Sequence, residues 1–280
     1  MTTAQTQNHQ GPLDRNHFLL RRLHSLTGVV PIGVFLLFHL TTNASVVWGM
    51  LDSREGEALR ERGVRTFQNE VDFIHSTPFL FLVEVFGLWL PIAFHSLLGL
   101  YYAKTGKGNA ASYGWAANRR YSLQRLSGYV GVLFLFYHVA TLRWQWTFLM
   151  PGGVAWDGER AASTLALVLR GASEAALETG ASYTLGGVIV SLFYMLGVSL
   201  LVFHFANGLW TAAITWGLTV SQKAQQRWGV VCAGLGVALM ALAWSSLIGF
   251  MTLDPKDAAA VERSNSGHKA PAMHLGGSRH

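Results

Sequence analysis

The sequence contains few charged residues and almost no cysteine. Charged side chains make up 13% of its 280 residues, whereas hydrophobic ones make up 51% and occur in long blocks. The single cysteine, Cys232, lies in one of these blocks and excludes both an internal disulfide framework and an iron–sulfur cluster ligated by cysteines of this chain. Long apolar blocks with little charge are typical of an integral membrane protein.

Five apolar blocks are long enough to cross a bilayer, which takes roughly 20 residues of helix. The expected spans are residues 27–48, 79–103, 127–149, 185–216 and 229–252. The first block has no small-residue cleavage site near its end, so it is expected to remain as a membrane helix. The sequence therefore predicts an all-α bundle of five transmembrane helices.

Basic residues lie on one side of this predicted topology. The N-terminal segment and the second and fourth connections carry ten of them against one acid, Asp14: Arg15, Arg21, Arg22, Lys104, Lys107, Arg119, Arg120, Arg125, Lys223 and Arg227. The first connection mixes charges of both signs. The positive-inside rule then places the N-terminus in the cytoplasm. The formal net charge of +6 is explained by this topology and indicates no nucleic-acid partner.

The ends of the chain and the third connection have a different composition. Residues 1–14 are polar and expected to be disordered, residues 15–253 form the membrane anchor, and residues 254–280 are expected to be a flexible tail. The connection 150–184 is long, and its part 159–178 has the composition of a helix lying at the membrane surface.

Four histidines lie inside four different apolar blocks: His39, His95, His138 and His204. An ionisable side chain at bilayer depth is costly and normally has a partner and a function. Two imidazoles facing each other across a helix bundle are the axial ligands of a b-type haem. The alternative is that each histidine only donates a hydrogen bond to a neighbouring helix. The motif Cys-x-x-Cys-His is absent, so a haem would be bound non-covalently.

The direction of each helix predicts which histidines pair. His39 and His138 lie on outward-running helices, roughly 17 Å from the inner boundary, and His95 lies about 12 Å deep on an inward-running helix. His204 lies on the other inward-running helix. The predicted pairs are therefore His95 with His204 nearer the inside, and His39 with His138 nearer the outside.

Other polar residues near the predicted helix ends have open roles. Arg21, Arg22 and Arg125 could pair with haem propionates. His24 and His75 could contact a quinone or a propionate, or be ordinary interfacial residues. Glu84 could carry protons or reach the surface by snorkelling. Pro91, four residues before His95, should kink its helix.

The motifs around these histidines closely resemble a known family. They are Arg21-Arg22-Leu23-His24-Ser25-Leu26-Thr27-Gly28-Val29, Phe38-His39-Leu40, Leu90-Pro91 with His95, Leu123-Gln124-Arg125-Leu126-Ser127-Gly128, Tyr137-His138-Val139 and His204-Phe205-Ala206-Asn207-Gly208-Leu209-Trp210. The family is the dihaem cytochrome b subunit of succinate dehydrogenase and fumarate reductase, of the five-helix b558 type. The resemblance runs from about Arg15 to Leu253. A weak internal echo also links Arg22-Leu23-His24-Ser25 with Gly28 to Arg125-Leu126-Ser127-Gly128.

The resemblance implies a function in electron transfer. It implies two haems b, with His95 and His204 ligating the proximal haem iron and His39 and His138 the distal one. It also implies a bacterial cytoplasmic membrane location, a flavoprotein and an iron–sulfur subunit bound on the cytoplasmic face, and a membrane quinone as electron acceptor. Succinate chemistry would then belong to another chain, although quinone could be reduced at this one.

Two rival functions remain at the level of the sequence. The same anchor could work in reverse as a quinol:fumarate reductase, because haem potentials depend on burial and on hydrogen bonding around the ligands. A protein of another class, a haem-free membrane scaffold or transporter, could use the histidines as a proton relay. No catalytic residue is assigned. The connection 150–184 and the tail are longer than in the shorter family members.

Overall fold

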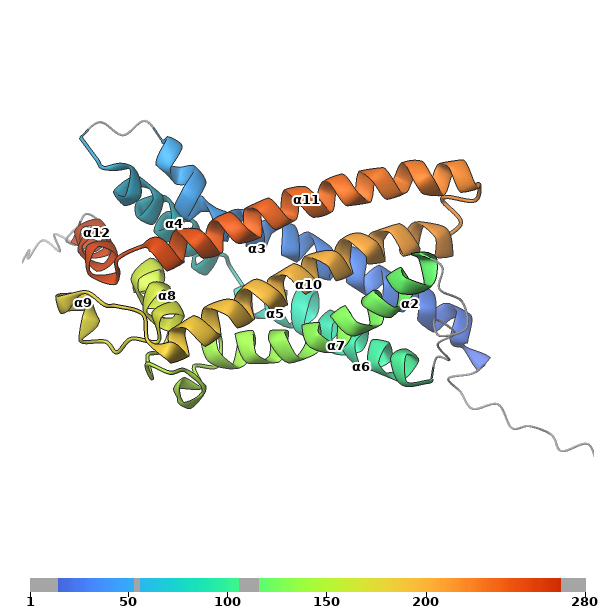
Figure 1. The fold of residues 1–280 in the computed structure, drawn as a ribbon, viewed down its shortest axis with the longest axis horizontal. Coiled ribbons are helices and arrows are strands. Elements are labelled where there is room, and N and C mark those ends of the chain that lie inside the picture. Colours follow the sequence, from blue (N-terminus) through green and yellow to red (C-terminus); the bar gives the residue numbers. More distant parts are fainter. Residues whose placement is uncertain (1–14, 53–55, 106–115, 268–280) are drawn as a thin grey trace, which may run out of the picture. The chain divides into compact units, whose positions relative to one another are not determined.

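The fold of the chain is known from a computed structural model, which describes residues 15–52, 56–105 and 116–267 (Figure 1). Over these ranges it is helical and contains no strand. The helices that make up the apolar segments are α2 (His17–Val29), α3 (Pro31–Trp48), α5 (Leu80–Glu84), α6 (Leu90–Thr105), α7 (Ala116–Leu142), α10 (Leu185–Thr215) and α11 (Gln222–Thr252). The others are α4 (Leu59–His75), α8 (Ala161–Arg170), α9 (Ala176–Thr179) and α12 (Pro255–Gly267). Short turns are η1 (Gly49–Leu51), η2 (Val85–Trp89), η3 (Thr147–Leu149) and η4 (Gly158–Arg160).

Five of the described helical segments are long and apolar enough to cross a membrane, which confirms the predicted fold class. They are His17–Leu51, Leu80–Thr105, Arg119–Leu142, Leu185–Thr215 and Gln222–Thr252. The first, third and fifth begin earlier than expected because arginine, lysine and glutamine are good helix formers and extend a helix beyond its apolar part. The third also ends earlier, at Leu142.

The helix that carries His95 is irregular just before Pro91. A π-helical turn, η2, occupies Val85–Trp89, and the Leu90 N–H donates to the carbonyl of Val85. Because Pro91 has no N–H, the carbonyl of Gly87 cannot accept the usual bond from four residues ahead. The disturbance expected at Pro91 takes the form of this π turn, a common cause of helix distortion.

The chain divides into two compact units. Unit 1 comprises Met1–Leu37, Phe81–Val132 and Leu200–Ala238; unit 2 comprises Phe38–Leu80, Leu133–Ser199 and Leu239–His280. Helices α3, α5, α7, α10 and α11 contribute residues to both. His24, His95 and His204 belong to unit 1, whereas His39 and His138 belong to unit 2.

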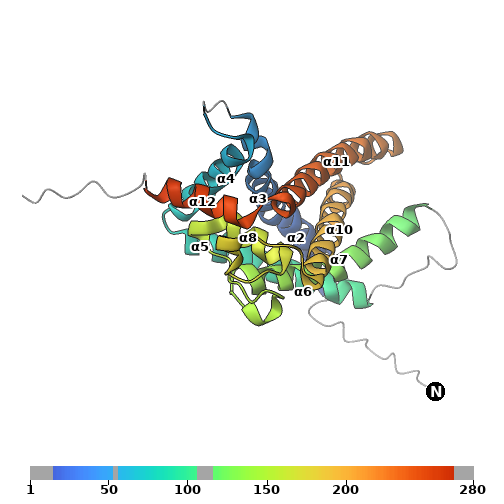
Figure 2. The ribbon, with the colours of Figure 1, turned by 60° about the vertical axis from the view of Figure 1, so that its left-hand side comes forward.

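In unit 2, helices α4, α8 and α12 pack together, as Figures 1 and 2 show. All ten residues of α8 are buried. The first N–H groups of α8, which have no acceptor within the helix, donate to side chains of the other two helices. The Ala161 N–H donates to Gln68 Oε1 of α4 at 3.1 Å, and the Ala162 N–H donates to Glu262 Oε1 of α12 at 2.7 Å. These bonds satisfy donors that every helix start leaves unpaired.

Two expectations for this region are wrong. The expected surface helix 159–178 is replaced by the shorter α8, which ends at Arg170 and is buried, followed by the single turn α9. Residues 255–267 of the expected flexible tail form α12, whose Ala258, Ala259 and Glu262 are each 1% exposed. Short apolar side chains at helical spacing supply a face that packs on its neighbours. Residues 1–14 and 268–280, also expected to be disordered or flexible, lie outside the described residues.

Candidate functional site

His95 on α6 and His204 on α10 bring their rings together in unit 1. The ring centroids lie 6.1 Å apart, and the ring planes are nearly perpendicular, at 85°. The histidines are 109 positions apart in the sequence, so the packing of the helices, and not local structure, brings the two rings together. The pair is the first of two such arrangements in the described chain.

The backbone of α2 holds the ring of His95. His95 Nδ1 lies 2.8 Å from the carbonyl oxygen of His24. Since a carbonyl only accepts, Nδ1 must carry the proton, which leaves Nε2 as the nitrogen with a lone pair. Gly28 makes room for the ring: a Cβ at this position would lie 2.5 Å from His95 Cε1. The imidazole is therefore both oriented and fixed in one tautomer.

Helix α7 holds His204 in the same way. His204 Nδ1 lies 3.2 Å from the carbonyl oxygen of Gln124, and the Ser127 hydroxyl lies 3.2 Å from the same nitrogen. A Cβ at Gly128 would lie 3.2 Å from His204 Cε1. The Gln124 side chain also donates to the carbonyl of His204 at 3.1 Å.

The two supports correspond position by position. In each, the carbonyl that accepts from the histidine belongs to the residue four before a glycine, His24 before Gly28 and Gln124 before Gly128. In each, a hydroxyl just before that glycine donates to the same carbonyl at 3.0 Å, from Thr27 and from Ser127. The two supports are therefore related by a shift of 100 positions, which differs from the shift that aligns Arg22-Leu23 with Arg125-Leu126 in the weak sequence repeat.

An amide network that the sequence motifs contained, but to which no role was given, supports His204. Asn207 is 4% exposed; its Nδ2 donates to Gln124 Oε1 at 2.8 Å, and its Oδ1 accepts from Arg120 Nε at 3.1 Å. The Arg120 guanidinium also lies 4.1 Å from the ring centroid of Trp210. Amide side chains inside apolar helices are costly unless paired, which is the signal that could have identified Gln124 and Asn207.

The second pair lies in unit 2. The ring centroids of His39 on α3 and His138 on α7 are 5.7 Å apart, with ring planes at 86°. Phe134 stacks beside His138 at 5.9 Å, and Tyr194 approaches it edge-on at 5.9 Å. His138 Nδ1 is buried and has no hydrogen-bond partner among the described residues, while the Asn43 amide lies 3.5 Å from His39 Nε2.

Among the other predicted site residues of unit 1, His24 contacts the first pair. His24 stacks on His95, with centroids 4.0 Å apart and planes within 11°. The Arg22 guanidinium lies 4.2 Å from the Phe18 ring centroid, and Arg125 donates to the carbonyl of Ala103. Arg21 is exposed at the first turns of α2. Arg22 and Arg125 thus contact an aromatic ring and a backbone carbonyl, respectively.

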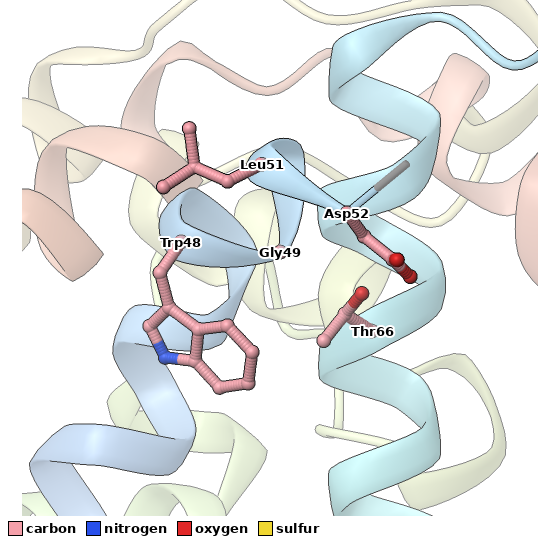
Figure 3. A pocket seen from close by; sticks show the side chains of 5 residues that line it. All are labelled: Trp48, Gly49, Leu51, Asp52 and Thr66. Atoms are coloured by element: carbon pink, nitrogen blue, oxygen red, sulfur yellow. The ribbon is translucent and has the colours of Figure 1, made fainter. Parts of the chain in front are cut away.

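The remaining sequence candidates are apart from the pairs. His75, at the end of α4, faces Gly158 and lies 6.2 Å from Trp156, and Glu84 is the last residue of α5. A shallow pocket at the end of α3 is lined by Trp48, Gly49, Leu51, Asp52 and Thr66 (Figure 3). Leu51 is 87% exposed, so the pocket is open, and none of the predicted site residues lines it.

A comparison with curated proteins identifies a relative of this chain. The succinate dehydrogenase cytochrome b558 subunit of Bacillus subtilis (strain 168) is 32% identical over 234 residues, which cover 84% of this chain and 97% of the relative. The chain belongs to this family. The family resemblance of its motifs is thereby confirmed. With five helices long and apolar enough to cross a membrane, the chain is a multi-pass membrane protein. No family model and no solved structure matches the chain.

A cytochrome b carries haem b, whose iron is held by axial side-chain ligands such as imidazole. A metal–imidazole bond is about 2 Å long and the ring centre lies about 1 Å beyond the bonded nitrogen, so two imidazoles on one iron have centroids about 6 Å apart. The observed separations are 6.1 Å and 5.7 Å. Protonation of Nδ1 in His95 and His204 presents Nε2 for ligation, and a hydrogen bond from the other ring nitrogen is usual for a metal-binding histidine.

Proposed function

We propose that this chain is the membrane anchor of a succinate:quinone oxidoreductase and carries electrons on two bis-histidine haems b. His95 and His204 would ligate the proximal haem iron, and His39 and His138 the distal one. The observation that carries the proposal is the spacing of both ring pairs, 6.1 Å and 5.7 Å between centroids, at near-perpendicular angles. Family membership supports the same assignment and speaks against a haem-free scaffold or transporter.

The residues of the chain hold and tune the ligands. A b-type haem, when bound, accepts and releases one electron at a time. The carbonyls of His24 and Gln124 accept from Nδ1 of His95 and His204, which makes Nε2 a stronger donor to iron and favours the oxidised state. Apolar helices around the rings exclude water, which favours the reduced state because that state carries less charge. The potential follows from the balance of the two effects.

The partners follow from the family and the charge pattern. We infer that a flavoprotein and an iron–sulfur subunit dock on the cytoplasmic face of a bacterial inner membrane, where the predicted topology places the N-terminus and the basic connections. Arg21, Arg22, Arg125 and His24 would contact haem propionates or the quinone. The name of the relative favours succinate oxidation over fumarate reduction as the direction of flow.

Spectra of single-histidine variants test the proposal. The purified complex should contain two haems b per chain, seen as two steps in a redox titration of the reduced-minus-oxidised spectrum. His95→Ala and His204→Ala should each lose the same haem, and His39→Ala and His138→Ala the other. His75→Ala, a histidine outside both pairs, serves as the control and should retain both. Selective loss of one haem from a crossed pair, such as His39 with His204, would contradict the assignment.

A further inference from the structure

We propose that the side chain of His24 is a positioning group that orients the ring of His95 and, by excluding water beside it, raises the midpoint potential of the haem held by His95 and His204. The inference rests on the proposed function, since it takes His95 as an iron ligand. His24 itself is not assigned to the iron. Its ring lies nearly parallel to that of His95 at 4.0 Å, whereas two ligands of one iron face each other through their nitrogens across about 6 Å.

His24 contacts His95 at two separate places. Its backbone carbonyl accepts from Nδ1 at 2.8 Å, and its side chain covers one face of the imidazole. The first contact fixes the tautomer, and the second restricts rotation of the ring about its bond to the backbone. Together they leave His95 one orientation toward a ligated metal.

The helices α2 and α6 are built around this stack. Gly28 of α2 lies against the ring of His95, and Gly99 of α6 lies against the ring of His24, where a Cβ would lie 3.1 Å from Cε1. Each helix therefore supplies a glycine opposite the histidine of the other. A contact that needs two close backbone approaches is specific, and it requires a ring of imidazole size at both positions.

The stack is not repeated at the other ligand. The residue that corresponds to His24 in the support of His204 is Gln124, which offers the same carbonyl but no ring. A backbone carbonyl thus orients both ligands, whereas a stacked side-chain ring, that of His24, is added at His95. Such a difference between otherwise matching supports indicates a role beyond holding the helix together.

The ring of His24 also separates His95 from the end of the helix pair. The ring of Tyr102 approaches that of His24 at 6.0 Å, and the ring of the exposed His17 approaches Tyr102 at 5.4 Å. His24 is thus the inner member of a row of rings that leads from an exposed residue to His95. Removing it would admit water next to the ligand, and water stabilises the more highly charged oxidised haem.

The test compares His24→Ala and His24→Phe in the purified complex by redox titration and by electron paramagnetic resonance. His24→Ala should lower the midpoint potential of the His95–His204 haem and shift its low-spin signal, with the other haem unchanged. His24→Phe, which keeps a flat ring without nitrogen atoms, should restore both values toward those of the wild type. His17→Ala removes a histidine of the same row that does not touch His95, and should change neither.

Several outcomes would overturn the inference. Unchanged potentials and signals in His24→Ala, with both haems present, would show that the ring has no influence. If His24→Phe shows the same shifts as His24→Ala, or if both variants lose the His95–His204 haem, ring stacking does not set the potential. Failure of the proposed function gives a different result, because the wild-type complex would then lack two haem steps, or His95→Ala would retain both haems.

Discussion

Nδ1 of His95 donates to the backbone carbonyl of His24 at 2.8 Å, while the ring of His24 stacks on the ring of His95 at 4.0 Å. One residue thus controls both the proton position and the orientation of the other. The same carbonyl contact recurs between His204 and Gln124, so the polar groups that hold the first histidine pair come from two matching turns, one on α2 and one on α7.

The glycines that face the rings of the proposed ligands His95 and His204 should tolerate substitution by alanine in proportion to the space around them. A methyl group at Gly28 would lie 2.5 Å from His95 Cε1, whereas at Gly128 it would lie 3.2 Å from His204 Cε1. Gly28→Ala should therefore cost about 1–3 kcal/mol and weaken retention of the His95–His204 haem, with a smaller effect for Gly128→Ala. Haem content after heating measures this order.

The control for these variants is Gly234→Ala in α11, where nothing lies within 4 Å of the added methyl group. It should leave haem retention unchanged, because the methyl group meets no neighbour and alanine has a higher helix propensity than glycine. Equal haem loss from Gly28→Ala and Gly234→Ala would contradict a steric role for Gly28.

Asn207 is expected to matter for His204 although it does not touch the ring. Asn207→Ala would remove the donor to Gln124 Oε1 and the acceptor of Arg120 Nε, at a cost of about 1–3 kcal/mol. The thermal midpoint of the complex should fall, and the His95–His204 haem should be lost first. Thr215→Ala, on the same helix and bonded only locally to the Thr211 carbonyl, should have little effect. Preferential loss of the other haem would rule out the network.

The ring geometry predicts the magnetic signature of the two proposed haems. With imidazole planes at 85° and 86°, the two iron orbitals that interact with the ligand π systems stay close in energy. The oxidised complex should therefore show two strongly anisotropic low-spin signals in electron paramagnetic resonance spectra at low temperature. Signals of the weakly anisotropic kind, typical of parallel imidazole planes, would show that the rings rotate when the haem binds.

Glu262 is expected to make the packing of α8 and α12 depend on pH. Burial raises the pKa of the Glu262 carboxyl above its usual value, although the Ser163 hydroxyl, the Ser163 and Ala162 N–H groups and the charge of Arg160 act in the opposite direction. A group whose pKa is raised by folding stabilises the folded state below its unfolded pKa, and this stability is lost as the pH rises through the folded pKa. Mild acidification from neutral pH should therefore stabilise this region.

Thermal unfolding of the wild type and Glu262→Gln between neutral and mildly acidic pH measures the effect. The amide of Glu262→Gln keeps an oxygen to accept from α8 and removes the titration, so its midpoint should change less with pH than that of the wild type. Glu262→Ala should lose about 1–3 kcal/mol at every pH, because the Ala162 and Ser163 N–H groups lose their acceptor. The exposed Glu159→Gln is the control. An unaltered pH dependence in Glu262→Gln would refute this role.

The sequence predicted some parts of this structure well and others poorly, for identifiable reasons. Helix content and the number of spans follow from long apolar blocks, so five helices could be predicted, although charged turns extended several of them. Helix α12 was missed because its composition is polar overall, and only its packing against α4 and α8 makes Ala258 and Glu262 interior residues. The surface position expected for α8 was wrong because its contacts with α4 and α12, which are distant in the sequence, bury it.

The candidate site shows the same division at the level of single residues. Four histidines in apolar segments can be recognised from the sequence, because the cost of burying a polar ring depends only on its surroundings along the helix. The stacking of His24 on His95 and the bond between Asn207 and Gln124 join residues 71 and 83 positions apart, and no local pattern encodes them.

The sequence by itself determined an all-α membrane protein with five spans and a polar ring within four of them, because hydropathy and helix length are local properties of the chain. Only the tertiary structure decided which backbone carbonyls fix the tautomers of His95 and His204, which glycines face their rings, and that α8 is buried under its neighbours. These features depend on helix faces that meet at distances of a few ångströms. If one helix were shifted along its neighbour by one residue, these side chains would face different atoms.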